Sequence, residues 1–145
     1  MEPADHPSLT LTQESAPDAA TARAIEAGLD AYNESVVPYG DWAPLWIVGR
    51  DGAGSVQAGL RAITVYDWMF VIWLWVGAAH RGAGIGSRLL ADAETTARTR
   101  GCRASYLDTF SFQAPKFYER RGYREFGRLD SFPPGHARIW LWKTL

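Results

Sequence analysis

A glycine-rich segment in the middle of the chain has the composition of an anion-binding loop. Gly82, Gly84 and Gly86 follow an apolar stretch that ends at Val76, and an amphipathic segment begins directly after them. Glycine lets the backbone come close to a ligand and turn several N–H groups the same way. The first N–H groups of a helix have no partner within the helix and carry partial positive charge. Strand, loop and helix start together predict an anion site, and phosphate is the usual anion.

Two common phosphate-binding patterns do not fit this loop. A P-loop ends in Gly-Lys-Ser/Thr with the lysine on the phosphates, and the loop contains no such ending. A dinucleotide-binding fingerprint requires Gly-x-Gly-x-x-Gly after the first strand of a βαβ unit, whereas the spacing here is Gly-x-Gly-x-Gly after predicted hairpins. Arg81, Gly84 and Gly86 instead fill the pattern Arg-x-x-Gly-x-Gly.

The loop is expected to lie between a strand and a helix of one sheet layer. Short turns predict three successive antiparallel strands, at 45–48, 55–65 and 68–77. Apolar residues at helical spacing predict a helix over 84–100, which Gly101 ends. The next strand, 104–110, should run parallel to 68–77 because a helix connects the two.

The other predicted elements complete one α+β domain over 1–145. They are a loose tail at 1–7, a short strand at 9–12, a helix from about 18 to 32, a helix at 115–121 that Gly122 closes, and a final hairpin of strands at 123–129 and 138–143.

Composition narrows the class of protein. The chain has 145 residues and a net charge of -1, so there is no basic surplus to neutralise a nucleic-acid backbone. The longest apolar run, 68–79, is too short to span a bilayer, and no signal peptide is evident. Cys102 is the single cysteine and is expected to be buried, without a disulfide or a metal site. We therefore expect a cytoplasmic protein with no nucleic-acid, membrane or metal partner.

Two segments together resemble the GCN5-related N-acetyltransferase (GNAT) family. The first is the loop with Arg81, Gly84 and Gly86, and the second is Ala-Pro-Lys-Phe-Tyr-Glu-Arg-Arg-Gly-Tyr at 114–123, which is similar to the family's second signature. The order of elements is also similar from about residue 8 to the end. The resemblance implies a layered α/β/α fold: a mixed, mostly antiparallel sheet of six to seven strands and about four helices. It also implies that strands 68–77 and 104–110 splay apart.

The resemblance implies acetyl-CoA as the cofactor. Loop N–H groups of 81–86 would hold its pyrophosphate, and its pantetheine arm would lie along the splayed end of the strand, with the Val76 backbone near the thioester. The residues expected to bind the cofactor are Leu74, Trp75, Val76, Arg81, Gly82, Ala83, Gly84, Ile85, Gly86, Ser87, Ser111, Ala114 and Phe117. Ser111 stands where the family often has Asn.

Amine acetylation needs a proton donor for the leaving thiolate and a base for the amine. By resemblance Tyr118 is the general acid, and the alternative is an aromatic residue that only packs under its helix. The strand before the loop carries no carboxylate, so the usual base is missing. Glu34, Asp41, Asp108 and His136 remain as candidates, of which His136 has the most suitable intrinsic pKa. A turn residue is the alternative reading of His136.

Aromatic residues suggest where the acceptor binds. Tyr32, Tyr39, Trp42 and Trp73 could form a pocket for an aromatic or cationic amine. Core packing or a dimer surface is the alternative.

The predicted function is transfer of an acetyl group from acetyl-CoA to a primary amine of a small molecule, directly in a ternary complex. Two alternatives stay open: a non-catalytic acyl-CoA-binding sensor on the same fold, and a protein or peptide N-acetyltransferase. A homodimer is compatible with the sequence.

Overall fold

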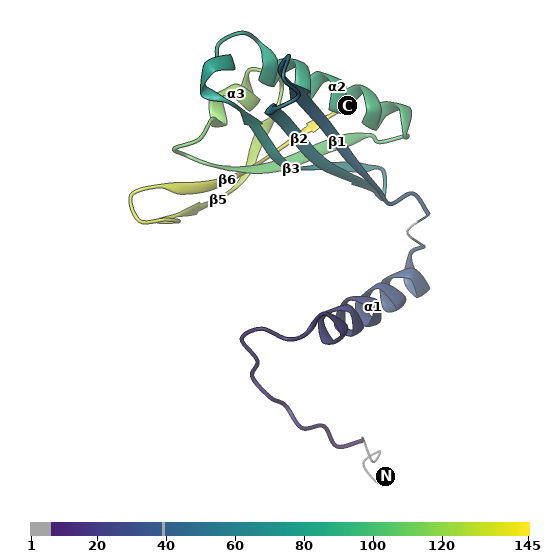
Figure 1. Ribbon diagram of the computed structural model, residues 1–145. Coiled ribbons are helices and arrows are strands. Elements are labelled where there is room, and N and C mark those ends of the chain that lie inside the picture. Colours follow the sequence, from purple (N-terminus) through teal and green to yellow (C-terminus); the bar gives the residue numbers. More distant parts are fainter. Residues whose placement is uncertain (1–6, 39) are drawn as a thin grey trace. The chain divides into compact units, whose positions relative to one another are not determined.

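The computed structural model describes residues 7–38 and 40–145. These form two compact units, one within 1–38 and one within 39–145 (Figure 1). The single domain expected over 1–145 stays a prediction, and most of the predicted tail at 1–7 lies outside the described residues. No helix of the described residues is both long and apolar enough to cross a membrane.

The N-terminal unit contains one helix, α1 (Ala19–Val36). The helix begins after Asp18, whose carboxylate accepts a hydrogen bond from the Thr21 N–H at 2.7 Å and so caps the first turn. It continues one turn past the predicted end, because residues 33–36 contain no residue that breaks a helix. The strand predicted at 9–12 was wrong: these residues form no strand, and no other strand lies in this unit for them to pair with.

The second unit contains a six-stranded sheet in the order β1-β2-β3-β4-β6-β5. Every neighbouring pair is antiparallel except β3 and β4, which are parallel, as the helical connection between them predicted. The strands are β1 (Ala43–Arg50), β2 (Val56–Val65), β3 (Trp68–Val76), β4 (Ala104–Phe110), β5 (Arg124–Asp130) and β6 (Ala137–Thr144).

Helix α2 (Ile85–Thr99) packs against β1, β2 and β3, and covers one face of the sheet in Figure 1. Its end is fixed by Gly101 at φ +85°, with the Cys102 N–H bonded to the Ala97 carbonyl at 2.9 Å. Two shorter helices complete the unit: a 3-10 turn η1 (Ala78–His80) and α3 (Pro115–Glu119). Cys102 is buried, as expected.

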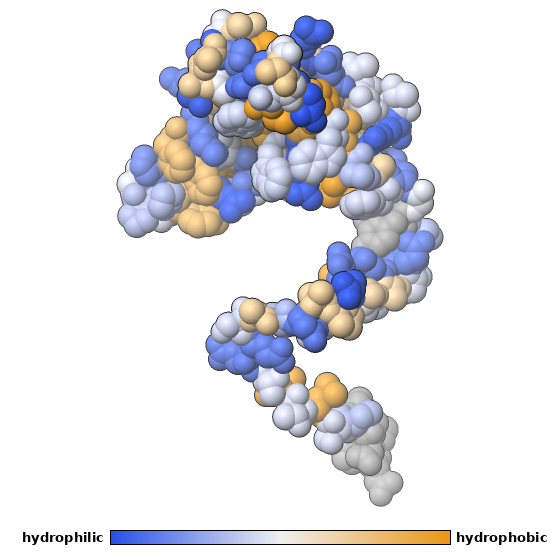
Figure 2. All heavy atoms as spheres, in the orientation of Figure 1, coloured by the Kyte–Doolittle hydropathy of each residue, from blue (hydrophilic) through white to orange (hydrophobic). Residues whose placement is uncertain are grey.

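The core lies between α2, α3 and the sheet. Its most deeply buried large side chains come from four strands, α2 and the residue before β5: Leu60, Met69, Leu90, Leu107, Tyr123 and Leu141. Outside this layer apolar side chains also reach the surface, and Figure 2 shows some of them over the β5–β6 hairpin, where Phe126, Leu129 and Phe132 are exposed. The α+β fold with a mixed sheet is confirmed.

The sheet is joined across β3 and β4 over only part of their length. Pairing runs from Trp68 opposite Ala104 to Val71 opposite Leu107 and then stops, so the two strands separate beyond this point. The predicted splay is therefore confirmed.

A β-bulge lies where the splay begins. On β2, Arg61 pairs with Trp73 and the next residue, Ala62, pairs with Val71, so Ile72 is an extra residue in β3. An extra residue reverses which side chains face the core. Val71 faces the core before the bulge, whereas beyond it Leu74 packs against the core and Trp73 is exposed.

Candidate active site

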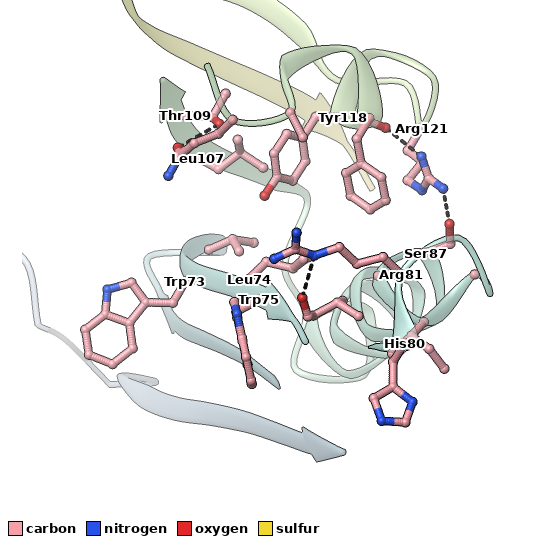
Figure 3. Close-up of a pocket in the computed structure, with 18 of the residues that line it drawn as sticks. Trp73, Leu74, Trp75, His80, Arg81, Ser87, Leu107, Thr109, Tyr118 and Arg121 are labelled. Atoms are coloured by element: carbon pink, nitrogen blue, oxygen red, sulfur yellow. Dashed lines mark hydrogen bonds between the residues drawn. The ribbon is translucent and has the colours of Figure 1, made fainter. Parts of the chain in front are cut away.

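A cavity of about 930 Å³ lies where β3 and β4 separate. Its walls come from the end of β3, the glycine loop, the start of α2, the end of β4 and α3 (Figure 3). The residues that line it and were predicted to bind cofactor are Leu74, Trp75, Val76, Arg81, Gly82, Gly84, Ile85, Gly86, Ser87, Ala114 and Phe117. One cavity thus brings together two segments about 30 residues apart in the sequence.

The glycine loop presents free N–H groups to this cavity. Gly82 and Gly84 have φ values of +76° and +77°, a backbone conformation that residues other than glycine rarely adopt. The first bond of α2 runs from the Arg88 N–H to the Gly84 carbonyl at 3.1 Å. None of the N–H groups of 82–87 donates a hydrogen bond to any part of 7–38 or 40–145. Free donors at a helix start form a cradle for an anion.

Arg121 adds a positive charge to the wall beside this cradle. Its guanidinium donates to the Phe117 carbonyl at 2.7 Å, stacks 3.7 Å from the centre of the Phe117 ring, and also bonds the Ser87 hydroxyl. A Cβ on Gly86 would lie 3.3 Å from the Phe117 ring, so glycine at this position allows the close contact between α2 and α3. Sequence reasoning did not single out Arg121, because nothing local showed that it reaches α2.

The Nε of Arg81 is bonded to the backbone of β3 rather than left free for a phosphate. Its Nε donates to the Val76 carbonyl at 3.0 Å, at the end of the unpaired part of β3 (Figure 3). Its guanidinium therefore lies beside the strand edge, while the free N–H groups of the loop remain the donors available to an anion.

Tyr118 projects from α3 into the cavity, and its hydroxyl points toward the gap between β3 and β4 (Figure 3). The residue is 8% exposed, and the hydroxyl has no hydrogen bond to another described residue. Burial, and secondarily the negative charge of Asp108, raises the pKa of Tyr118 to about 12. The hydroxyl therefore keeps its proton at neutral pH and is available in the cavity as a proton donor.

Asp108 lines the same cavity from β4. Arg138 on β6 holds it: Nε lies 2.7 Å and Nη2 2.6 Å from the same carboxylate oxygen, Oδ1. Because the charge of Asp108 acts on Tyr118, the carboxylate and the hydroxyl belong to one electrostatic environment. The cavity therefore combines an anion cradle, a protonated hydroxyl and a carboxylate.

Comparison with known proteins decides the family. The Acetyltransferase (GNAT) family profile matches residues 11–123. The chain belongs to the GNAT acetyltransferase family. The cofactor of this family is acetyl-CoA, and the acetyltransferase described here is an enzyme of that class.

Individual relatives agree with this assignment. Acetyltransferase Atu2258 of Agrobacterium fabrum is 40% identical over 126 residues, which cover 87% of this chain and 92% of the relative. Blasticidin-S acetyltransferase of Streptomyces morookaense is 47% identical over 93 residues, 63% of this chain and 68% of the relative. A crystal structure of an acetyltransferase from Agrobacterium tumefaciens has a TM-score of 0.89 and 36% identity, with 94% of this chain and 100% of that chain covered.

Three residues predicted to bind the cofactor or to act in catalysis lie outside the cavity wall. Ser111 follows β4, and its hydroxyl accepts a hydrogen bond from the Ala137 N–H at 2.9 Å, so it fastens β4 to β6. His136 lies in the β5–β6 loop with its ring centre 5.0 Å from that of Phe112, which does line the cavity. Ala83 is likewise absent from the wall. The cofactor and base roles of these residues stay predictions.

The residues predicted to form an acceptor pocket are only partly brought together. Trp73 lines the cavity, whereas Trp42 does not. Tyr32 is in α1, which belongs to the N-terminal unit, and Tyr39 lies outside the described residues. The pocket stays a prediction.

A different aromatic group surrounds Trp73. Its ring centre lies 6.0 Å from that of Trp46 on β1, and the guanidinium of Arg61 on β2 lies 4.7 Å from the Trp73 ring and 5.2 Å from the Trp46 ring. The three residues form one row because Trp46 pairs with Arg61 and Arg61 pairs with Trp73. This row depends on strand register, which composition alone does not show.

Proposed function

We propose that this acetyltransferase transfers the acetyl group of acetyl-CoA to a primary amine of a small molecule, directly in a ternary complex. The observation that carries the proposal is a single cavity that joins the free N–H groups of 82–87 to the Tyr118 hydroxyl through the gap between β3 and β4. The free N–H groups suit a pyrophosphate, and the Tyr118 hydroxyl suits proton transfer to the thiolate that leaves a thioester.

Each part of the cavity suits one part of acetyl-CoA. The N–H groups of 82–87 would hold the pyrophosphate, and the nearby Arg121 would add charge. The unpaired part of β3, after Val71, offers a strand edge to the amides of pantetheine. Acetyl-CoA supplies the acetyl group as a thioester, which an amine can attack with loss of the thiolate.

Tyr118 is proposed as the general acid. When the new C–N bond forms and the C–S bond breaks, the hydroxyl gives its proton to the thiolate sulfur, and the excess proton of the amine goes to a base. A tyrosine with a pKa of about 12 remains protonated until that moment and regains its proton from solvent afterwards. His136 stays the base predicted from sequence, although Asp108 is the one of the four candidates that lines the cavity.

A small amine is favoured as the acceptor by one relative. Blasticidin-S acetyltransferase is named for a small-molecule substrate, and its 47% identity is the highest among the proteins compared above. The rival functions are a sensor that binds acyl-CoA without turnover and an acetyltransferase for proteins or peptides. Location in the cytoplasm and assembly into a homodimer stay predictions.

Release of free thiol from acetyl-CoA tests the proposal. We expect acetyl-CoA to raise the melting temperature of the protein, and thiol to appear when small primary amines, including blasticidin S, are added. A melting shift without thiol release from any amine, aminoglycoside or peptide would support the sensor. Release with peptides alone would support the third function.

A further inference from the structure

Arg138 grips Asp108 in an unsymmetrical way. A guanidinium and a carboxylate usually form two parallel hydrogen bonds, one to each oxygen. Here both nitrogens converge on Oδ1, at 2.7 and 2.6 Å. The other oxygen, Oδ2, accepts no hydrogen bond from any residue of 7–38 or 40–145. One oxygen is therefore used to fix the carboxylate, and the other is left available.

Aromatic rings lie around the guanidinium of Arg138. The central carbon of Arg138 lies 5.4 Å from the ring centre of Phe110, 5.6 Å from that of Phe132 and 5.3 Å from that of Trp140. Contacts of this kind attract a cation and limit its movement. The register places Arg138 opposite Phe110 and Trp140 opposite Asp108, so two paired strands carry all of the group except Phe132, which lies in the β5–β6 loop.

The free oxygen belongs to a residue of the cavity wall. Asp108 immediately follows Leu107, the last residue of β4 that pairs with β3, so it lies at the point where the sheet opens. Its side chain is 19% exposed, which leaves it accessible from the cavity but mostly shielded from bulk water. A shielded carboxylate interacts with a cation more strongly than an exposed one.

We propose that Asp108 Oδ2 binds the ammonium group of the acceptor amine, and that Arg138 is the positioning residue that aims this oxygen. The proposal rests on the proposed function and adds the acceptor's class: an amine that arrives protonated.

The same arrangement links acceptor binding to proton donation. The charge of Asp108 disfavours the ionised form of Tyr118 while the site holds no cation. An ammonium group on Oδ2 offsets that charge, so the hydroxyl becomes a better donor when an acceptor is present. The ammonium passes one proton to the base before its nitrogen attacks the thioester, and that nitrogen is then held near the hydroxyl that protonates the leaving sulfur.

Four variants of the full chain test the proposal, with blasticidin S and tyramine as probe amines. Arg138→Met removes the grip, Arg138→Lys keeps a cation, and Asp108→Asn removes the charge at constant shape. Arg128→Met is the matched control, because Arg128 forms an ion pair with Glu125 on the same hairpin and does not line the cavity. Thiol release gives KM for the amine and kcat, and titration calorimetry gives the Kd for acetyl-CoA.

We expect kcat/KM for the amine to fall about 10- to 100-fold in Arg138→Met, with the Kd for acetyl-CoA unchanged, because a misplaced contact group costs about this much. Arg138→Lys should recover part of the loss, as should added methylguanidinium in Arg138→Met. In Asp108→Asn, the KM for the amine should rise steeply as the pH falls below the pKa of the amine, because this variant accepts only the neutral form.

The outcomes separate the two proposals. An Arg138→Met protein whose amine kcat/KM stays within about 2-fold of Arg128→Met would overturn the inference alone, as would an unchanged pH profile in Asp108→Asn. A wild-type protein that binds acetyl-CoA and acetylates neither probe nor any other amine would overturn the proposed function and the inference with it.

Discussion

Val71 and Leu107 are the last residues at which β3 and β4 are paired, and the next residue of each strand lines the cavity. Ile72 forms the bulge, and Asp108 carries the carboxylate on the cavity wall. The opening in the sheet, the change of strand faces and the carboxylate of the cavity wall thus occur at one level.

Tyr118→Phe should lower kcat about 10- to 1,000-fold and leave the Kd for acetyl-CoA near that of the wild type, because only the proton donor is removed. Thiol release and titration calorimetry measure the two quantities. Tyr106→Phe is the matched control: Tyr106 stacks on Phe70 with ring centres 4.7 Å apart and does not line the cavity. Equal turnover in the two variants would remove Tyr118 from the mechanism.

Gly84→Asp should raise the Kd for acetyl-CoA about 100-fold or more, because a carboxylate in the anion cradle repels pyrophosphate. Gly54→Asp serves as its control. Both glycines have positive φ, +77° and +83°, and a Cβ on either would meet nothing within 4 Å. The two variants therefore share the same backbone strain and the same added charge. If they bind acetyl-CoA equally well, the cradle is not the pyrophosphate site.

Ser111→Ala should lower the free energy of unfolding by about 1–3 kcal/mol, because the Ala137 N–H loses its acceptor. The Kd for acetyl-CoA should change little, since Ser111 is not in the cavity wall. Urea unfolding provides the measurement, and Ser55→Ala, at a hydroxyl without a hydrogen bond in the described chain, provides the comparison. A raised Kd for acetyl-CoA with an unchanged free energy of unfolding would instead support the cofactor contact that the sequence predicts for Ser111.

The free energy of unfolding should decrease as the pH rises from about 10 to about 12. Burial raises the pKa of Tyr118 from its ordinary value of 10.0 to about 12, so the unfolded state loses its proton first and is favoured over this interval. A shift of this size corresponds to at most about 3 kcal/mol. Urea unfolding at several pH values should show a shallower decrease in Tyr118→Phe than in the wild type. Identical slopes would mean that this tyrosine ionises as easily in the folded protein.

The sequence predicted those features that depend on local residues. The helix over 84–100 follows from its spacing of apolar residues, and its end from Gly101. The strand at 104–110 has the bounds expected. The anion cradle follows from glycines and a helix start, both of which lie within a few residues of one another.

Features that depend on pairing between distant strands could not be read from the sequence. The grip of Arg138 on Asp108 joins residues 30 positions apart and requires the register of β4 on β6. The row formed by Trp46, Arg61 and Trp73 requires two further registers. A bulge is a mismatch between two strands, and neither strand shows it alone. His136 was favoured for its chemistry, whereas its distance from the cavity depends on how the β5–β6 loop is folded.

The extra residue in β3 sets which side chains beyond it face the core and which are exposed. Beyond Ile72, Leu74 packs against the core beside the glycine loop, while Trp73 and Trp75 stand on the other face. A substitution at Trp73 therefore changes the exposed face of this strand and leaves the packing of Leu74 against the core in place. Such a division lets the exposed side of the strand vary in sequence independently of the core that the other side supports.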